Sequence, residues 1–430
     1  MIDFIRSLLG GLLPNWLVVL LAYLIIITLV LVAVPATFML QVWVERRVVA
    51  RMQDRLGPNR VGPAGLLQSV ADGVKMFTKE DVVPRDADQW VHLLAPIITL
   101  APVVLMFAVI PWARGVVPAD VNIAVLFVLA VSSISAVGLM MGGWGSNNKF
   151  ALLGTMRAVA QMISYEIPAV LSLLTMVMVT GTMSLARMPE LQSGLPIVGS
   201  SVPGAPDLGL GWFVFTPVGL VGFIVFFICV LSEGERTPFD IPEADSEIVA
   251  GYMTEYSGMK FALFFLGQFA LGFGLSIITS IAFLGGWQGP GVAQLAALGG
   301  VWETLAGILS LVYMLLKAWG LFFVMVWLRG AFPRLRVDQL MSFAWKFLLP
   351  LTLFNLLSAA LWVVITQWGI EQGLGSLSPE HLAPWMRYLL AFVVTLLING
   401  LAFRWLVQIN NEDEPGELAQ EQSLGAAPLS

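Results

Sequence analysis

Two charged residues lie deep inside long apolar stretches of this 430-residue chain. Glu166 follows Ser164-Tyr165 in one stretch, and Lys317 lies near the middle of another. A charged side chain surrounded by hydrocarbon is costly, so each needs a partner, water or a change of protonation state. Each residue therefore fits one of two roles: an ion pair or hydrogen bond that fixes a helix, or a step in a proton relay.

The segment 232–258 is strongly acidic. It has seven carboxylates against Arg236, a local charge equal to the net charge of −6 of the whole chain. The acids are Glu233, Glu235, Asp240, Glu243, Asp245, Glu247 and Glu255. Carboxylates held close together and away from water cannot all ionise, so some can accept and pass protons near neutral pH. A solvated loop is the alternative, but the interspersed apolar residues, Phe239, Ile241, Ile248 and Tyr252 among them, disfavour it.

The composition indicates that a membrane surrounds these charges. Hydrophobic residues make up 58% of the chain and charged residues 12%, against roughly 25% charged in soluble domains. Apolar runs of about 20 residues recur, each long enough to cross a hydrocarbon core of about 30 Å as a helix. We predict an all-α, polytopic transmembrane bundle of about nine spans, at 16–43, 92–112, 121–141, 157–181, 213–232, 261–284, 303–328, 347–368 and 386–407.

The sequence predicts one domain followed by a tail. Residues 1–410 form a single transmembrane domain in this prediction, and 411–430 form an acidic tail that we expect to be disordered. The first apolar run is too long for the core of a signal peptide, so it is expected to be a retained span.

The basic residues predict the orientation. Seventeen of the 22 Lys and Arg residues fall in the loops that share one side with the C-terminus, and four fall on the opposite side. Because Lys and Arg accumulate in cytoplasmic loops, we expect the N-terminus outside and the C-terminus in the cytoplasm.

One cytoplasmic loop is expected to contain a helix that lies in the membrane interface. Between 64 and 79 the apolar residues recur every three to four positions, while polar residues occupy the other faces. The apolar positions are Leu66, Leu67, Val70, Val74 and Phe77. This amphipathic segment should lie on lipid or on a partner protein.

Several functions are disfavoured by what the sequence lacks. A single cysteine, Cys229, with His92 and His381 is too small a set for an iron–sulfur cluster or a structural zinc, so we predict no metal site. The Gly-rich turn at 142–145 has no following Lys-Ser/Thr and does not predict a phosphate loop. We expect no nucleic-acid partner and no cofactor bound by this chain.

Four groups of segments resemble the H subunit of bacterial respiratory complex I, the NADH-quinone oxidoreductase. They are 45–47 (ERR), 52–59 (MQDRLGPN) and 71–80 (ADGVKMFTKE); 157–161 (RAVAQ) and 163–166 (ISYE); 236–240 (RTPFD) through 255–256 (EY); and 329–334 (RGAFPR) with 338–341 (DQLM). They occur in the family order. The resemblance extends over most of the chain, from about residue 16 to residue 408.

The resemblance implies a subunit that joins the peripheral redox arm to the membrane arm and lines the quinone chamber. It suggests quinone as the substrate, with FMN and iron–sulfur clusters in partner subunits. Polar residues bordering the chamber would be Arg46, Arg55, Asp72, Arg236 and Asp240. The carboxylates leading from the chamber into the proton-pumping arm would be Glu166, Glu233, Glu243, Asp245 and Glu247. The charge argument points independently to the same carboxylates.

The chain departs from the family pattern at three positions. Asp245 replaces the usual Glu, Glu235 stands where a neutral residue is usual, and Gln268 stands where Glu is common. Because Gln268 cannot ionise, a relay must bypass it through water or use another acid. The ninth span favours a bacterial source.

We therefore expect a bacterial inner-membrane subunit that couples quinone reduction to proton translocation, in contact with membrane lipid and with the other membrane and peripheral-arm subunits. The equivalent subunit of a membrane-bound hydrogenase or another dehydrogenase is the nearest alternative. A stand-alone ion transporter would show inverted repeats, and none is visible. A purely structural anchor would bury many acids without using them.

Overall fold

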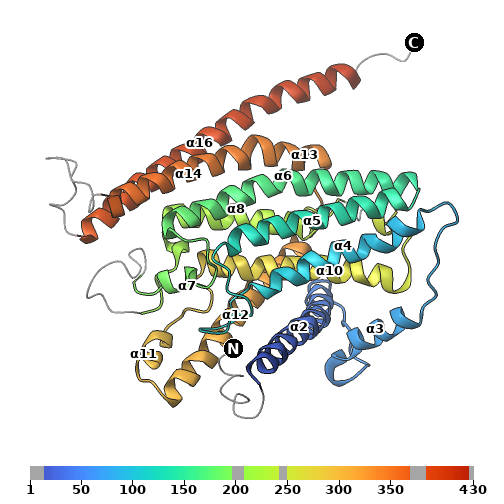
Figure 1. The fold of residues 1–430 in the computed structure, drawn as a ribbon. Coiled ribbons are helices and arrows are strands. Elements are labelled where there is room, and N and C mark those ends of the chain that lie inside the picture. Colours follow the sequence, from blue (N-terminus) through green and yellow to red (C-terminus); the bar gives the residue numbers. More distant parts are fainter. Residues whose placement is uncertain (1–13, 196–207, 242–248, 369–383, 426–430) are drawn as a thin grey trace.

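The apolar runs form long helices that pack side by side in the computed structural model (Figure 1), which describes residues 14–195, 208–241, 249–368 and 384–425. Eight helical segments in these ranges are long and apolar enough to cross a membrane. They are α2 (Asn15–Met52), α4 (Gln89–Ala108), α5 (Ala124–Gly145), α6 (Lys149–Thr180), α10 (Gly258–Phe283), α12 (Val301–Ala331), the run from α13 (Val337–Ser342) through η4 (Phe343–Leu348) and α14 (Leu349–Val363) into η5 (Val364–Trp368), and α16 (Pro384–Gly425). The chain is an all-α, multi-pass membrane protein.

The remaining predicted span, 213–232, corresponds to α8 (Pro217–Glu233). At 17 residues α8 is shorter than the others, at the lower limit of what crosses a bilayer. It lies inside the bundle, where Val225, Phe226 and Cys229 are buried. A predicted boundary also moves: α6 begins at Lys149 rather than at 157, so Arg157 lies within this helix.

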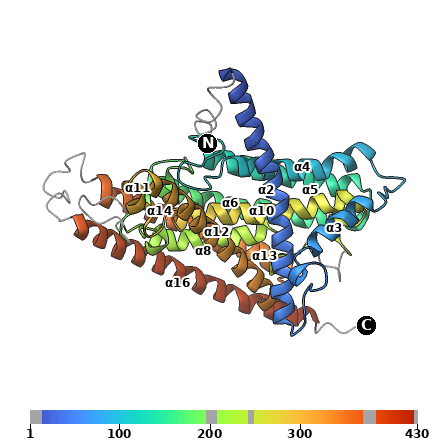
Figure 2. The same cartoon turned by 90° about the horizontal axis from the view of Figure 1, so that it is seen from below.

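Helix α2 crosses the other helices steeply (Figure 2). Its 38 residues span about 57 Å at 1.5 Å per residue, well beyond a hydrocarbon core of about 30 Å. A helix that exceeds the bilayer thickness is accommodated by tilt. Much of its surface is exposed and apolar, including Tyr23, Ile27 and Leu31, as expected of a helix that faces lipid.

The predicted interfacial helix is present. Helix α3 (Gln68–Thr78) follows the short turn η1 (Pro63–Gly65) and packs against α2 and α10. Its apolar residues Leu67, Val70, Val74 and Phe77 remain exposed. Both ribbon views place α3 at the opposite end of the bundle from α11 (Val292–Ala297). This agrees with the predicted spans, which put the connections 44–91 and 285–302 on opposite sides of the membrane.

Small residues let the central helices approach closely. A Cβ added to Gly138 on α5 would lie 2.3 Å from Oγ1 of Thr99 on α4, so only glycine fits there, as is common where membrane helices touch. Helix α6 packs against α5, α8 and α14 and thus occupies the centre of the bundle. Shorter elements complete the described chain: α7 (Met188–Leu191), η2 (Phe213–Phe215) and η3 (Gly251–Met253).

The predicted tail begins inside the last described helix. Helix α16 continues to Gly425, past the boundary at 410. Glu, Leu, Ala and Gln residues, which favour helices, are frequent in this stretch and let the helix extend. The assignment of 411–430 as a separate tail stays a prediction.

Candidate functional site

The acidic segment folds onto the bundle at the end of α8. Gln161 on α6 donates from Nε2 to the carbonyl oxygens of Ser232, at 2.9 Å, and Phe239, at 2.7 Å. One turn further along α6, the ring of Tyr165 packs edge-on against Phe239 at 5.3 Å between centroids. These contacts hold residues 232–239 against the centre of the bundle.

The described part of this segment is therefore not a solvated loop. The exposed fractions are 8% for Glu233, 4% for Glu235, 6% for Arg236 and 3% for Asp240. Charged residues are rarely this buried unless they are paired or hydrogen-bonded, and the structure shows partners for Glu235, Arg236 and Asp240.

Glu45 on α2 joins three parts of the chain. One carboxylate oxygen pairs with Arg236 at 2.8 Å, and the other pairs with Arg329 at the end of α12. The Arg236 guanidinium also lies over the ring of Phe269 on α10, 3.8 Å from its centroid. Beside this cluster, Arg334 pairs with Asp240 at 3.0 Å. Fixed positive charges thus hold the acidic segment to α2, α10 and α12.

Glu166 is partly buried and lies next to a polar group. Its carboxyl is hydrogen-bonded to the hydroxyl of Ser133 on α5. Five residues earlier on the same helix, Gln161 is hydrogen-bonded to the carbonyl of Ser232, which precedes Glu233 at the end of α8. Two of the acids that the sequence predicts for a relay thus lie on helices that pack against each other.

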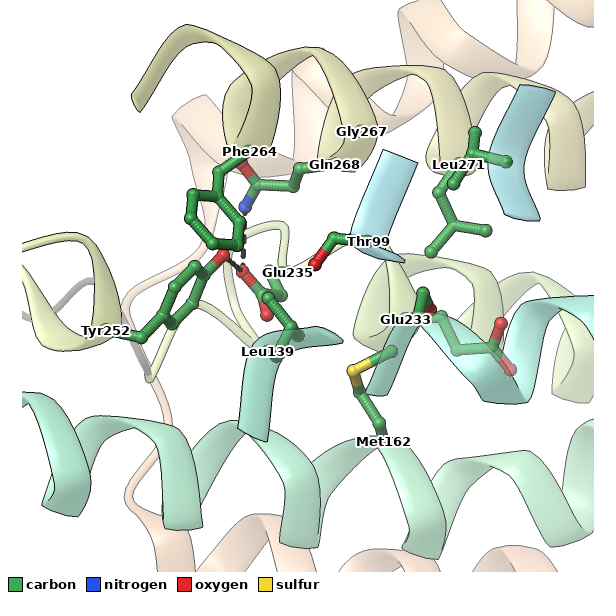
Figure 3. A pocket seen from close by; sticks show the side chains of 12 residues that line it. Thr99, Leu139, Met162, Glu233, Glu235, Tyr252, Phe264, Gly267, Gln268 and Leu271 are labelled. Atoms are coloured by element: carbon green, nitrogen blue, oxygen red, sulfur yellow. Dashed lines mark hydrogen bonds between the residues drawn. The ribbon is translucent and has the colours of Figure 1, made fainter. Parts of the chain in front are cut away.

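A small cavity of about 20 Å³ opens beside Glu233 (Figure 3). Its polar walls include Thr99, Glu233, Glu235, Tyr252 and Gln268. Glu235 accepts hydrogen bonds on Oε2 from the Tyr252 hydroxyl at 2.8 Å and from Gln268 Nε2 at 3.1 Å. Met162, Phe264 and Leu271 close the cavity with apolar surface.

Lys317 is explained by structure. Its ammonium donates to the backbone carbonyls of Leu284, Gly286 and Gln288 at 2.6, 2.8 and 2.6 Å. These contacts engage all three of its protons. It also lies 4.3 Å from the ring centroid of Trp212. The side chain fastens the end of α10 to α12, which favours the structural alternative for this residue over a relay.

Of the other predicted chamber residues, Arg46 and Asp72 meet at α3. Arg46 on α2 pairs with Asp72 on α3 at 2.6 Å, and both side chains are partly exposed. Arg55 is exposed and donates to Oε1 of Gln53 at 2.7 Å. Arg46 follows Glu45 directly in the chain, so neighbouring residues of α2 bind the interfacial helix and the acidic segment.

Three predicted relay residues, Glu243, Asp245 and Glu247, lie outside the described residues, and their roles stay predictions. Sequence reasoning left four site residues without a role: Glu45, Arg329, Arg334 and Tyr252. Glu45 carried a usable signal, because it is an acid at the end of an apolar run followed by two arginines. Among the described residues, no group of three or more His, Cys, Asp or Glu is placed to hold a metal ion.

Comparisons with known proteins agree with this architecture. The family model for NADH dehydrogenase matches residues 23–360. The chain is 47% identical over 324 residues to the H subunit of the NADH-quinone oxidoreductase of Dehalococcoides mccartyi strain CBDB1, covering 75% of this chain and 82% of that protein. It is 43% identical over 360 residues to the protein of the same name from Chlorobaculum parvum, covering 83% and 96%.

The matched region contains α4, α5, α6, α8, α10 and α12, which build the buried acidic site, and most of α2. The resemblance noted from the four groups of segments is confirmed. This chain belongs to the NADH dehydrogenase family, together with the H subunits of NADH-quinone oxidoreductases.

Proposed function

We propose that this chain is the membrane subunit of an NADH-quinone oxidoreductase that lines the quinone chamber and couples quinone reduction to proton translocation. The chamber residues would be Arg46, Arg55, Asp72, Arg236 and Asp240. The relay would include Glu166 and Glu233, with Glu243, Asp245 and Glu247 continuing it. The electron carriers would lie in partner subunits.

One observation carries the relay part of this proposal. Glu166 and Glu233 come from two helices that pack against each other: Gln161, five residues before Glu166 on α6, donates a hydrogen bond to the carbonyl of Ser232, the residue before Glu233 on α8. Two carboxylates held close together away from water share protons readily, because both cannot be charged at low cost. The pair therefore favours proton transfer over a purely structural role.

The proposed quinone chamber is supported by where its residues lie. The pair Arg46–Asp72 and the pair Arg236–Glu45 share adjacent residues of α2. A quinone headgroup bound in this region would have the interfacial helix on one side and the acidic segment on the other. Reduction of a quinone to a quinol takes up two protons, so charge would change directly beside Arg236 and the buried acids.

We place the protein in the bacterial inner membrane, with its N-terminus outside and its C-terminus in the cytoplasm. The strong bias of basic residues toward one side supports this orientation. The basic loop between α2 and α3 would then face the peripheral arm. Arg51 in the last turn of α2 and Arg55 and Arg60 in the loop are exposed and available to acidic surfaces of partner subunits.

The test uses the complex purified from its native membrane through a tag on this chain and reconstituted in vesicles. The proposal predicts NADH-driven quinone reduction with proton uptake, and photolabelling of this chain by an azido-quinone that excess quinone prevents. A complex that oxidises hydrogen but not NADH would support the hydrogenase alternative. Ion transport by the isolated chain without redox partners would contradict the proposal.

A further inference from the structure

We propose that Ser133 is a positioning residue for the relay, and that its hydroxyl turns between Glu166 and the Leu129 carbonyl as Glu166 releases and takes up a proton. The inference rests on the proposed role of Glu166 in proton transfer, and adds the group that keeps this carboxyl hydrogen-bonded in both of its states. It is carried by the two acceptors that lie beside one hydroxyl.

The Ser133 hydroxyl has acceptors on two different helices. Its Oγ lies 2.9 Å from the carbonyl oxygen of Leu129, one turn earlier on α5, and is hydrogen-bonded to Oε1 of Glu166 on α6. A serine hydroxyl has one proton to donate and two lone pairs that accept. Ser133 can therefore donate fully to only one of the two acceptors at a time, while its oxygen can also accept.

The Leu129 carbonyl keeps other donors when this hydroxyl turns away. Within α5 it accepts the helical hydrogen bond from the backbone amide of Ser133, and the Ser132 hydroxyl donates to it at 3.0 Å. The bond from a serine hydroxyl to the carbonyl one turn back is a local bond that competes with other partners. Turning the Ser133 hydroxyl toward Glu166 therefore leaves the carbonyl hydrogen-bonded.

The protonation state of Glu166 decides which way the hydroxyl points. An ionised carboxylate only accepts, so Ser133 donates to it. A protonated carboxyl donates its own O–H to Ser133 Oγ, and the Ser133 proton then returns to the Leu129 carbonyl. The O–H bond of Ser133 stays intact throughout, and the transferred proton passes only between Glu166 and the other relay acids.

Glu45 shows the contrasting arrangement of a carboxylate that keeps its charge. Its two oxygens pair with Arg236 and Arg329, and a guanidinium donates but cannot accept. Protonation of Glu45 would break both ion pairs, whereas protonation of Glu166 preserves a hydrogen bond to Ser133. A hydroxyl partner thus suits an acid that gains and loses a proton during turnover.

The packing around Ser133 gives this hydrogen bond weight. Ser133 and Glu166 are both partly buried, on helices α5 and α6 that pack against each other, so water replaces the bond less readily than on an open surface. A hydrogen bond to a charged group also contributes more than one between neutral groups. Without the hydroxyl, the ionised form of Glu166 loses this support, so proton release should be slower.

The test measures the rate of NADH-driven proton translocation by the whole complex in vesicles, with complex content determined in parallel. Ser133→Ala removes the hydroxyl, and we expect the rate to fall about tenfold, the effect of losing one hydrogen bond to a charged group. Ser133→Thr keeps a hydroxyl and should restore most of the rate. Ser132→Ala is the matched control, because Ser132 donates to the same carbonyl, and it should pump like the parent.

Infrared spectroscopy separates positioning from simple packing. Redox-induced infrared difference spectra of the complex contain the C=O stretch of carboxyl groups that change protonation, and a band missing from Glu166→Gln belongs to Glu166. This band should shift in Ser133→Ala and stay in place in Ser132→Ala. A hydroxyl that only packs α5 on α6 would lower complex content and leave the band unshifted.

The outcomes separate this inference from the proposed function. Parent-like pumping by Ser133→Ala, with loss in Glu166→Gln, overturns the role of Ser133 and leaves the relay intact. Pumping by Ser133→Thr that is no better than that of Ser133→Ala also overturns it, because the hydroxyl would then not be the group that matters. If Ser133→Ala does not assemble, Ser133→Cys decides, since a thiol is a weak donor: slower pumping supports the role and parent-like pumping overturns it. Parent-like pumping by Glu166→Gln would instead contradict the proposed relay itself.

Discussion

Arg236 and Glu45 are separated by 191 positions in the sequence and form a buried ion pair at 2.8 Å. The pair joins the acidic segment after α8 to the end of α2. Glu233, one of the proposed relay acids, lies three residues before Arg236, so the pair fixes how the end of α8 sits relative to α2. The proposed relay therefore begins next to a structural ion pair.

The first prediction concerns this pair. Arg236→Met removes one of the two arginines that Glu45 binds, and a hydrogen bond to a charged group contributes about 1.5–3 kcal/mol. We expect less assembled complex and a lower thermal midpoint. Arg46→Gln is the control, because its pair with Asp72 is partly exposed and such pairs contribute about 0–1 kcal/mol. Equal stability of the two variants would show that the buried pair does not anchor the segment.

The second prediction concerns Lys317. Lys317→Met leaves three backbone carbonyls without their donor, so the complex should lose stability. Protons translocated per NADH should stay unchanged in the complex that assembles. Lys149→Met, at the exposed start of α6, is the control for removing a lysine charge. A stable Lys317→Met complex that no longer pumps would contradict the structural role and place this residue in the relay.

The third prediction is the orientation. Native Cys229 is fully buried, so a membrane-impermeant maleimide should not label the unaltered chain in intact cells. Leu298→Cys, at an exposed position between α11 and α12, should be labelled from outside. Arg60→Cys, in a chain that also carries Cys229→Ala, should react only after the membrane is opened in a denaturing detergent. The reverse labelling pattern would show that the N-terminus is in the cytoplasm.

The helices could be predicted from the sequence because each apolar run is long enough to cross the bilayer, and length alone decides this. The partners of the charged residues could not. Helices such as α4 and α10 are apolar on nearly every side, so no polar face tells which side meets a neighbour. Glu45 and Arg236 meet only because α2 crosses the bundle steeply, which is a property of packing.

For the candidate site, too, some residues could be predicted from the sequence, but their partners could not. Glu166 could be predicted as a candidate site residue, because a lone carboxylate in an apolar run is costly and usually has a function. The pairing of Glu235 with Tyr252 and Gln268 could not, because it depends on a left-handed backbone at Glu235 and on the position of η3 against α10. For Lys317, two alternatives stay open in the sequence, and only the three carbonyls beside its ammonium distinguish them.

The central claim is that Glu166 and Glu233 pass protons. Its most direct test is the number of protons translocated per NADH oxidised by reconstituted complexes with Glu166→Gln or Glu233→Gln, with complex content measured in parallel. Glu303→Gln, exposed in the first turn of α12, is the matched control. We predict that both relay variants assemble and lose proton translocation while Glu303→Gln pumps like the parent. If Glu166→Gln and Glu233→Gln also pump like the parent, the two carboxyls are structural and the proposed coupling is wrong.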